Sequence, residues 1–316
     1  MPNASSEPVA TGEAGRGEGA PSPERLDPTP HRQRIWALLT LAILGVGVYI
    51  MVLLTVDLSG LPSERSFEAG PDTPQRLKIY LEPLSVDPVN AAIQVRVEIA
   101  PDRALLGSQP NAPDRDLTVV LTTDDLVEQR VYRANQPIAA ETIRLNFAGG
   151  SVVRYPFDRY HISLRVQAIE GTGATSEIGH PIAHQVTVWE GTLGYRIRAT
   201  QASESAVGDM RLRLDIRRVA AQMFFALAAY VAMVVLACGS LTISSLVFLG
   251  HRKPEAALVG ALAALVFTLP ALRNAMPGGP PLGVWADLAV FLWAELAAVT
   301  GIGLLVLSWA RQGVSR

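Results

Sequence analysis

Two acidic residues, Asp287 and Glu295, lie inside an apolar stretch at residues 284–310 that is long enough to cross a membrane. An acidic side chain near the centre of a bilayer costs about 2.5–3.5 kcal/mol on insertion scales, so each one needs a partner or a function. Eight residues of helix would separate the two by about 80° around the axis and about 12 Å along it. They therefore share one broad face of the predicted helix, with Asp287 near the outer surface and Glu295 near the midplane.

Arg273 is the natural partner of Asp287, because it ends the preceding apolar stretch on the same side of the membrane. We expect these two residues to form an ion pair that fixes the loop between them, which contains Pro277. Glu295 has no comparable partner in its own hairpin, so it is either protonated or bonded to the apolar stretch at 219–250. The polar candidates in that stretch are Gln222, Thr242 and Ser244. A proton relay through Glu295 is the alternative hypothesis.

A dense group of aromatic and charged residues, RYPFDRYH, occupies residues 154–161. Its Tyr155, Pro156, Phe157 and Asp158 are typical of a turn in which the Asp side chain accepts hydrogen bonds from nearby backbone amides. The alternative hypothesis is a loop that rests on the membrane helices and couples them to the domain that carries it.

The sequence contains few features of a metal site or of an enzyme active site. His180 and His184 lie four residues apart, but Pro181 and the strand-like residues beyond it argue against a shared helix face, and no third ligand follows nearby. The motifs of phosphate-binding loops, nucleophile elbows and zinc proteases do not occur. We therefore predict no metal, no cofactor and no enzymatic activity.

Composition indicates a membrane protein. Apolar residues make up 49% of the 316 residues and gather in four blocks, at 35–56, 219–250, 256–272 and 284–310. A bilayer crossing takes roughly 20 apolar residues, which favours a transmembrane helix in each block. The formal net charge of -2 argues against a nucleic-acid partner. The single cysteine, Cys238, lies inside a block, so no intramolecular disulfide can form.

Basic residues beside the blocks predict the orientation. They are Arg32 and Arg34 before the first block, His251, Arg252 and Lys253 between the second and third, and Arg311 and Arg316 after the fourth. Four crossings bring all of them to one side, which the positive-inside rule makes cytoplasmic. Residues 57–217 are then extracytoplasmic, and residues 311–316 form a cytoplasmic tail. The block at 35–56 has no cleavage site and is expected to anchor the chain in the plasma membrane, behind a cytoplasmic leader at 1–34 whose composition predicts disorder.

The region between the first two blocks has the period of a β-strand. In AAIQVRVEIA, Ile93, Val95 and Val97 alternate with polar residues, and the same alternation recurs in later segments separated by turn residues. About seven or eight short strands in this pattern are typical of an antiparallel β-sandwich. The last of them ends at Ile216, almost directly before the block at 219–250, so the sandwich must lie on the membrane surface. The expected fold is a membrane α + β protein, with one N-terminal and three C-terminal transmembrane helices and an extracytoplasmic antiparallel β-sandwich.

Two motifs are similar to those of a known group. YPFDRY in the predicted sandwich and RNAMPGGPPLGVWADLAVFLWAE at 273–295 resemble the actinobacterial membrane proteins of domain-of-unknown-function family 4436. The resemblance covers most of the chain beyond the leader. It implies the same layout of one span followed by three. It supplies no activity that could be carried over to this chain.

A second likeness is to pentameric ligand-gated channels, whose β-sandwich touches the membrane through a Pro-Phe-Asp turn. The matching features here are Pro156-Phe157-Asp158, RLRLDIRR before the second block, Met276-Pro277, and Asp287. The likeness implies that aromatic residues of the turn pack on the loop at 274–283. It also implies that Asp158 bonds backbone amides or an arginine near the second block, such as Arg217.

One feature departs from those channels. If the third block lined a pore from Glu255, the inward positions would be Leu258, Leu262, Leu265 and Leu269. A constriction made only of leucine would dewet and block ions. Conduction is therefore not the leading hypothesis.

The sequence thus predicts a non-enzymatic protein of the cell envelope, embedded in the lipid bilayer, that binds a ligand or a partner protein through its extracytoplasmic domain. Assembly as a homo-oligomer is compatible with this prediction. A channel-like receptor is the first alternative. A transporter accessory protein that uses Glu295 is the second.

Overall fold

The computed structural model describes residues 63–70, 76–172, 179–202 and 206–314, together with scattered residues between 35 and 51. Those scattered residues are helical, but the expected span at 35–56 lies only partly within the described residues, and the leader at 1–34 lies outside them. Residues 1–51 and 52–316 form two separate units. The fold described below is that of the second unit.

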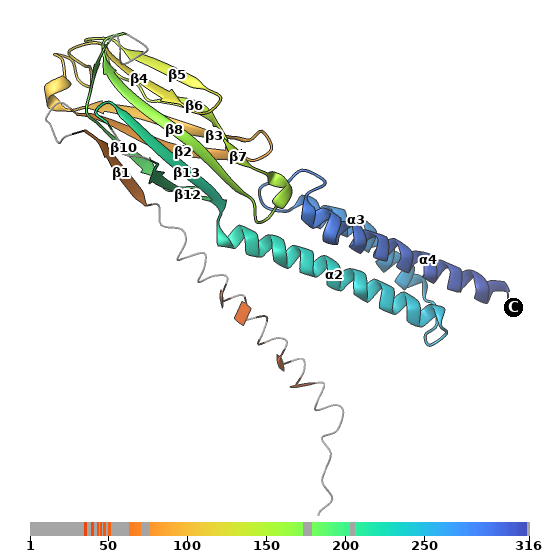
Figure 1. The fold of residues 1–316 in the computed structure, drawn as a ribbon. Coiled ribbons are helices and arrows are strands. Elements are labelled where there is room, and N and C mark those ends of the chain that lie inside the picture. Colours follow the sequence, from red (N-terminus) through yellow and green to blue (C-terminus); the bar gives the residue numbers. More distant parts are fainter. Residues whose placement is uncertain are drawn as a thin grey trace, which may run out of the picture. The chain divides into compact units, whose positions relative to one another are not determined.

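The second unit begins with a β-rich domain made of two sheets (Figure 1). The first sheet contains, in spatial order, β1 (Glu64–Ala69), β10 (His184–Trp189), β2 (Leu77–Asp87), β3 (Ala92–Pro101) and β6 (Glu141–Asn146). The second contains β11 (Gly191–Thr192), β12 (Tyr195–Gln201), β13 (Asp209–Arg218), β8 (Arg159–Glu170), β4 (Leu117–Thr122) and β5 (Val127–Tyr132). Two short strands, β7 (Gly149–Gly150) and β9 (His180–Pro181), pair with β8, and two 3-10 turns, η1 (Arg103–Leu105) and η2 (Val152–Arg154), complete the domain.

One strand pair among the described residues departs from the expected antiparallel arrangement. β10 and β2 run parallel, with Val186 opposite Ile79. The prediction of a purely antiparallel domain is therefore wrong at this pair. A parallel neighbour requires a long crossover, and here the chain makes β3 to β9 before it returns beside β2.

Both sheets contribute to a single hydrophobic core. Ile93, Val95 and Val97 of β3 are buried in it, while the intervening Gln94 and Arg96 are exposed. Members from the second sheet include Val119, Ile162, Leu164, Ile197, Leu212 and Leu214. The alternation read from the sequence thus assigns the buried face of these strands correctly, because successive side chains point to opposite faces of a sheet.

Three apolar helices follow the β-rich domain: α2 (Ala220–Phe248), α3 (Ala256–Asn274) and α4 (Leu292–Val314). Each is long and apolar enough to cross a membrane, and a π-helical turn, η3 (Asp287–Phe291), leads into α4. β13 ends at Arg218 and α2 begins at Ala220, so a single residue, Val219, separates the domain from the first helix. A join this short restricts how the two parts can move relative to each other.

Helices α2 and α4 approach closely at a glycine. A side chain at Gly301 would place its Cβ 2.5 Å from Oγ of Ser240 and 3.1 Å from Oγ of Ser244, so a larger residue would force these serine side chains or α2 to move. Small residues at helix interfaces allow such close packing in membranes.

The four leucines considered for a pore belong to the packing among these helices. Leu262 and Leu269 are buried, and Leu258 and Leu265 pack partly buried against the same clusters, whose members include Val247, Leu305 and Met233. This face of α3 therefore contributes to packing within the chain, and the channel-like alternative stays a prediction. The large side chains of this face are buried against the other helices of the same chain.

Candidate functional site

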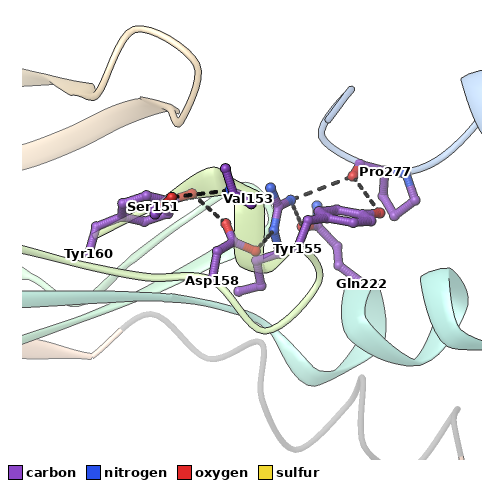
Figure 2. A network of polar contacts seen from close by, with 8 residues as sticks. Ser151, Val153, Tyr155, Asp158, Tyr160, Gln222 and Pro277 are labelled. Atoms are coloured by element: carbon purple, nitrogen blue, oxygen red, sulfur yellow. Dashed lines mark hydrogen bonds and ion pairs between the residues drawn. The ribbon is translucent and has the colours of Figure 1, made fainter. Parts of the chain in front are cut away.

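The RYPFDRYH segment forms the connection between β7 and β8, at the end of the domain that meets the helices. Ser151 caps the short turn η2 that precedes it, accepting a hydrogen bond from the amide of Val153 at 3.3 Å (Figure 2). Tyr155 and Pro156 are buried and joined by a cis peptide bond. Phe157, by contrast, is 62% exposed.

Asp158 is buried beneath this turn and forms an ion pair with Arg218. Nε of Arg218 donates to Oδ1 of Asp158 at 2.7 Å, and the hydroxyl of Tyr160 donates to Oδ2 at 2.7 Å. Both charged side chains have 0% exposure. The expected arginine, Arg217, is wrong by one residue: it is exposed, because β13 directs alternate residues outward and Arg218 lies on the inward face with Ile216.

Two tyrosine rings cover the Arg218 guanidinium. Its Cζ lies 4.7 Å from the ring centroid of Tyr155 and 5.0 Å from that of Tyr195, within the range of a cation–π interaction. Nη1 makes longer contacts with Oε1 of Gln222 at 3.4 Å and with the carbonyl oxygen of Pro277 at 3.5 Å. Removing either partner of such a pair would leave an uncompensated charge in a dry environment.

Burial also holds the surrounding phenols in their neutral form. It raises the pKa of Tyr155 to about 12. Burial and the hydrogen bond to Asp158 together raise the pKa of Tyr160 further. Both hydroxyls therefore remain hydrogen-bond donors at neutral pH.

The same group of residues contacts the loop between α3 and η3. The hydroxyl of Tyr155 donates to the carbonyl oxygen of Pro277 at 3.2 Å, and Met276 is buried in the cluster that contains Tyr155. Figure 2 shows Tyr155, Asp158, Gln222 and Pro277 converging from the turn, from α2 and from this loop. Of the aromatic residues expected to pack on the loop, Tyr155 does so.

A second buried ion pair closes the base of that loop. Nη2 of Arg273 lies 2.6 Å from Oδ2 of Asp287, and its Nε donates to Oδ1 at 3.1 Å. The remaining guanidinium hydrogens reach the carbonyl oxygens of Pro280 at 2.9 Å and Pro281 at 2.7 Å. The hydroxyl of Tyr230 also donates to Asp287 at 3.1 Å. The sequence identified Arg273 and Asp287, but it gave no indication of Tyr230 or of the proline carbonyls.

Glu295 lies apart from both ion pairs. Its Oε2 is buried and has no hydrogen-bond partner among the residues that the structure describes. The expected bond from α2 is not formed, since Gln222 contacts Arg218 and Thr242 donates to the carbonyl of Cys238. The hydroxyl of Ser244 is likewise buried without a partner within the described ranges.

The two histidines occupy different strands and different environments. His180 is exposed on β9, whereas His184 is fully buried on β10, with Nδ1 3.2 Å from the carbonyl oxygen of Ile182. Burial lowers the pKa of His184. Within the part of the chain that the structure describes, no three His, Cys, Asp or Glu side chains gather as metal ligands would.

These features define a class of protein: a β-rich domain followed at once by three candidate membrane helices, with buried Arg–Asp pairs at the junction. Residues 67–216 match the family model "Domain of unknown function (DUF4436)", which supports the resemblance to that family noted from the sequence. Residues 218–312 match the model of a second domain of unknown function, DUF8686. No curated protein matches the chain. The two matched ranges meet at the junction, so the pair formed by Asp158 and Arg218 links one matched domain to the other.

Proposed function

We propose that this chain is a non-enzymatic membrane protein whose extracytoplasmic β-sandwich binds a ligand or partner and is rigidly docked on its transmembrane helices. The single observation that carries the proposal is the buried pair of Asp158 and Arg218. Burying an ion pair is costly. A domain that was only tethered to the membrane would not need a fully buried pair at its base.

Three segments that are distant in sequence meet at this pair. Asp158 belongs to the turn before β8, Arg218 ends β13, and Pro277 belongs to the loop between α3 and η3. A displacement of the turn would therefore be transmitted both to the start of α2 and to the loop that the pair of Arg273 and Asp287 stabilises. This arrangement supports a receptor in which an event in the domain is transmitted to the helices.

The orientation rests on the basic residues at the other ends of the helices. His251, Arg252 and Lys253 follow α2 and are all exposed. Under the positive-inside rule they favour a cytoplasmic position, which places the β-rich domain outside. With a first span at 35–56, the protein crosses the membrane four times.

Hydrogen–deuterium exchange of the full chain in lipid nanodiscs tests the docking. Asp158→Asn should speed amide exchange in the turn at 152–158 and, at the same time, in the loop at 276–283. The matched control is Asp209→Asn, which breaks a half-buried pair with Arg165 that joins β13 to β8. Its effect should remain local. Unchanged exchange in the loop of the Asp158→Asn variant would show that the domain and helices are not coupled.

A second candidate function is proton transfer between α2 and α4, and it is favoured by a specific observation. Oε2 of Glu295 and the hydroxyls of Ser240 and Ser244 are all buried without hydrogen-bond partners among the described residues. Such atoms in a membrane helix are costly and are often functional. Proton flux into liposomes that disappears in Glu295→Gln would support this candidate, and the absence of flux in the unaltered protein would exclude it.

A further inference from the structure

A large cavity lies between the turn and the outer ends of the helices. Its volume is about 890 Å³, and residues of η2, of the turn, of α2 and of η3 line it. Leu227 and Trp285 supply an apolar wall on the helix side, and Arg154 and Arg159 supply cations on the domain side. The cavity thus combines a largely apolar lining with two cations on the domain side.

The cations of this region have no acidic partners. Arg154, Arg159 and Arg217 are exposed, and among the described residues no ion pair or hydrogen bond engages their guanidinium groups. No carboxylate lines the large cavity. A smaller cavity of about 260 Å³ on the other side of Phe157 is lined by Arg159 and Arg217, and its one carboxylate, Asp158, is engaged by Arg218. The whole region therefore favours an anion.

The position of the cavity along α2 matches the surface of a bilayer. Leu227 lies seven residues after the start of the helix, which is about 10 Å along its axis. Trp285 and Phe157 are 65% and 62% exposed beside it. Exposed aromatic residues of this kind gather at the level of lipid headgroups, and basic residues there attract anionic lipids.

We propose that this cavity binds an anionic phospholipid, with Arg154 and Arg159 contacting its phosphate and its acyl chains lying against Leu227 and Trp285. Its volume falls in the range of small-molecule sites, enough for a headgroup and the first part of the chains. Tyr155 lines the same cavity and also contacts Pro277, so a bound lipid stabilises the contact between the turn and the loop. The proposal rests on the membrane orientation proposed above, but not on transmission of a signal through the junction.

Native mass spectrometry of the full chain, titrated with phosphatidylglycerol or phosphatidylcholine, tests this site. Phosphatidylglycerol should bind more tightly. Arg154→Gln with Arg159→Gln should weaken its binding about tenfold or more, because each arginine near an anionic headgroup adds to the affinity. The matched control is Arg103→Gln with Arg211→Gln, which removes two exposed arginines from other parts of the domain. The control should change the affinity less than about twofold.

Four results would overturn the proposal. Equal binding of the two lipids would remove the role of charge, and an equal loss in the control pair would indicate general electrostatic attraction instead of a site. Displacement of the lipid by millimolar inorganic phosphate would indicate an anion site with no acyl-chain contact.

A photoactivatable phosphatidylglycerol adds a direct measurement, since it should label peptides that contain Leu227 or Trp285. Labelling only elsewhere would also contradict the assignment. A variant that loses the preference for phosphatidylglycerol but leaves amide exchange in the loop at 276–283 unchanged would separate this proposal from the docking proposal.

Discussion

Asp158 and Arg218 form an ion pair of 2.7 Å that has no solvent contact and joins the turn before β8 to the last residue of β13. Tyr160 satisfies the second carboxylate oxygen, and the rings of Tyr155 and Tyr195 cover the guanidinium. The pair therefore lies at the only covalent junction between the matched β-rich domain and the matched helical domain.

Breaking the pair on one side should strongly destabilise the protein. Asp158→Asn leaves Arg218 buried and unpaired, which should cost about 3–5 kcal/mol of unfolding free energy in mixed micelles. Asp209→Asn, which breaks the half-buried, partly solvated pair with Arg165, should cost about 1 kcal/mol. Adding Arg218→Gln to Asp158→Asn should restore part of the loss. A double variant that loses the sum of the two single effects would show that the residues do not interact.

The pair of Arg273 and Asp287 should behave in the same way, and the loss of its neighbour Tyr230 should have a smaller effect. Asp287→Asn should lower the unfolding free energy by a few kcal/mol, roughly as for other buried pairs, because Arg273 then keeps only the proline carbonyls. Tyr230→Phe removes one hydrogen bond to Asp287 and should cost about 0.5–1.5 kcal/mol. The Arg273→Gln, Asp287→Asn double variant should be more stable than additivity predicts. If Tyr230→Phe proved as damaging as Asp287→Asn, the ion pair would not be the dominant interaction.

Two adjacent glycines in the loop after α3 offer a matched comparison. Both have positive φ, +77° at Gly278 and +48° at Gly279, so alanine is strained at either position by about 1–2 kcal/mol. A Cβ at Gly278 would also collide with Nη1 of Arg218, whereas a Cβ at Gly279 would meet open space. Gly278→Ala should therefore lower the melting temperature more than Gly279→Ala does. Equal melting temperatures would place the loop away from Arg218.

The buried His184 should make stability depend on pH. Burial lowers its folded-state pKa below the unfolded value of about 6.5, so acidification protonates the unfolded state first. The unfolding free energy should therefore fall as the pH drops below about 6.5, by at most about 1.4 kcal/mol per pH unit from this one group. His184→Gln should flatten this slope, while His180→Gln, at an exposed position, should leave it unchanged. A slope that persists in His184→Gln would assign the dependence to another group.

The sequence predicted what depends on local period and composition. Alternation in β3 placed Val95 and Val97 in the core, and hydropathy located α2 and α3 within a few residues. The same alternation also places Arg218 on the inward face, since Leu212, Leu214 and Ile216 continue to it at intervals of two. A charged residue is rarely found on a buried face, so the alternation alone does not favour Arg218 over Arg217 as the partner of Asp158.

The remaining features depend on contacts that no local pattern encodes. The parallel pairing of β10 with β2 joins segments about a hundred residues apart, and strand order of this kind follows from the whole topology. The bond from Tyr230 to Asp287 joins α2 to η3 and depends on the rotation of each helix. In the turn, Tyr155 is buried while Phe157 is exposed, a difference that the local sequence does not encode. These are properties of tertiary packing.

The central claim, that the domain is docked and not tethered, is tested most directly by one distance distribution. Spin labels at Arg198 on β12 and at His251 beyond α2, both exposed, report on the two parts by double electron–electron resonance in nanodiscs, with Cys238→Ala as background. We predict a single narrow distribution for this protein and a broadened one after Asp158→Asn. A broad distribution that Asp158→Asn leaves unchanged would contradict the account.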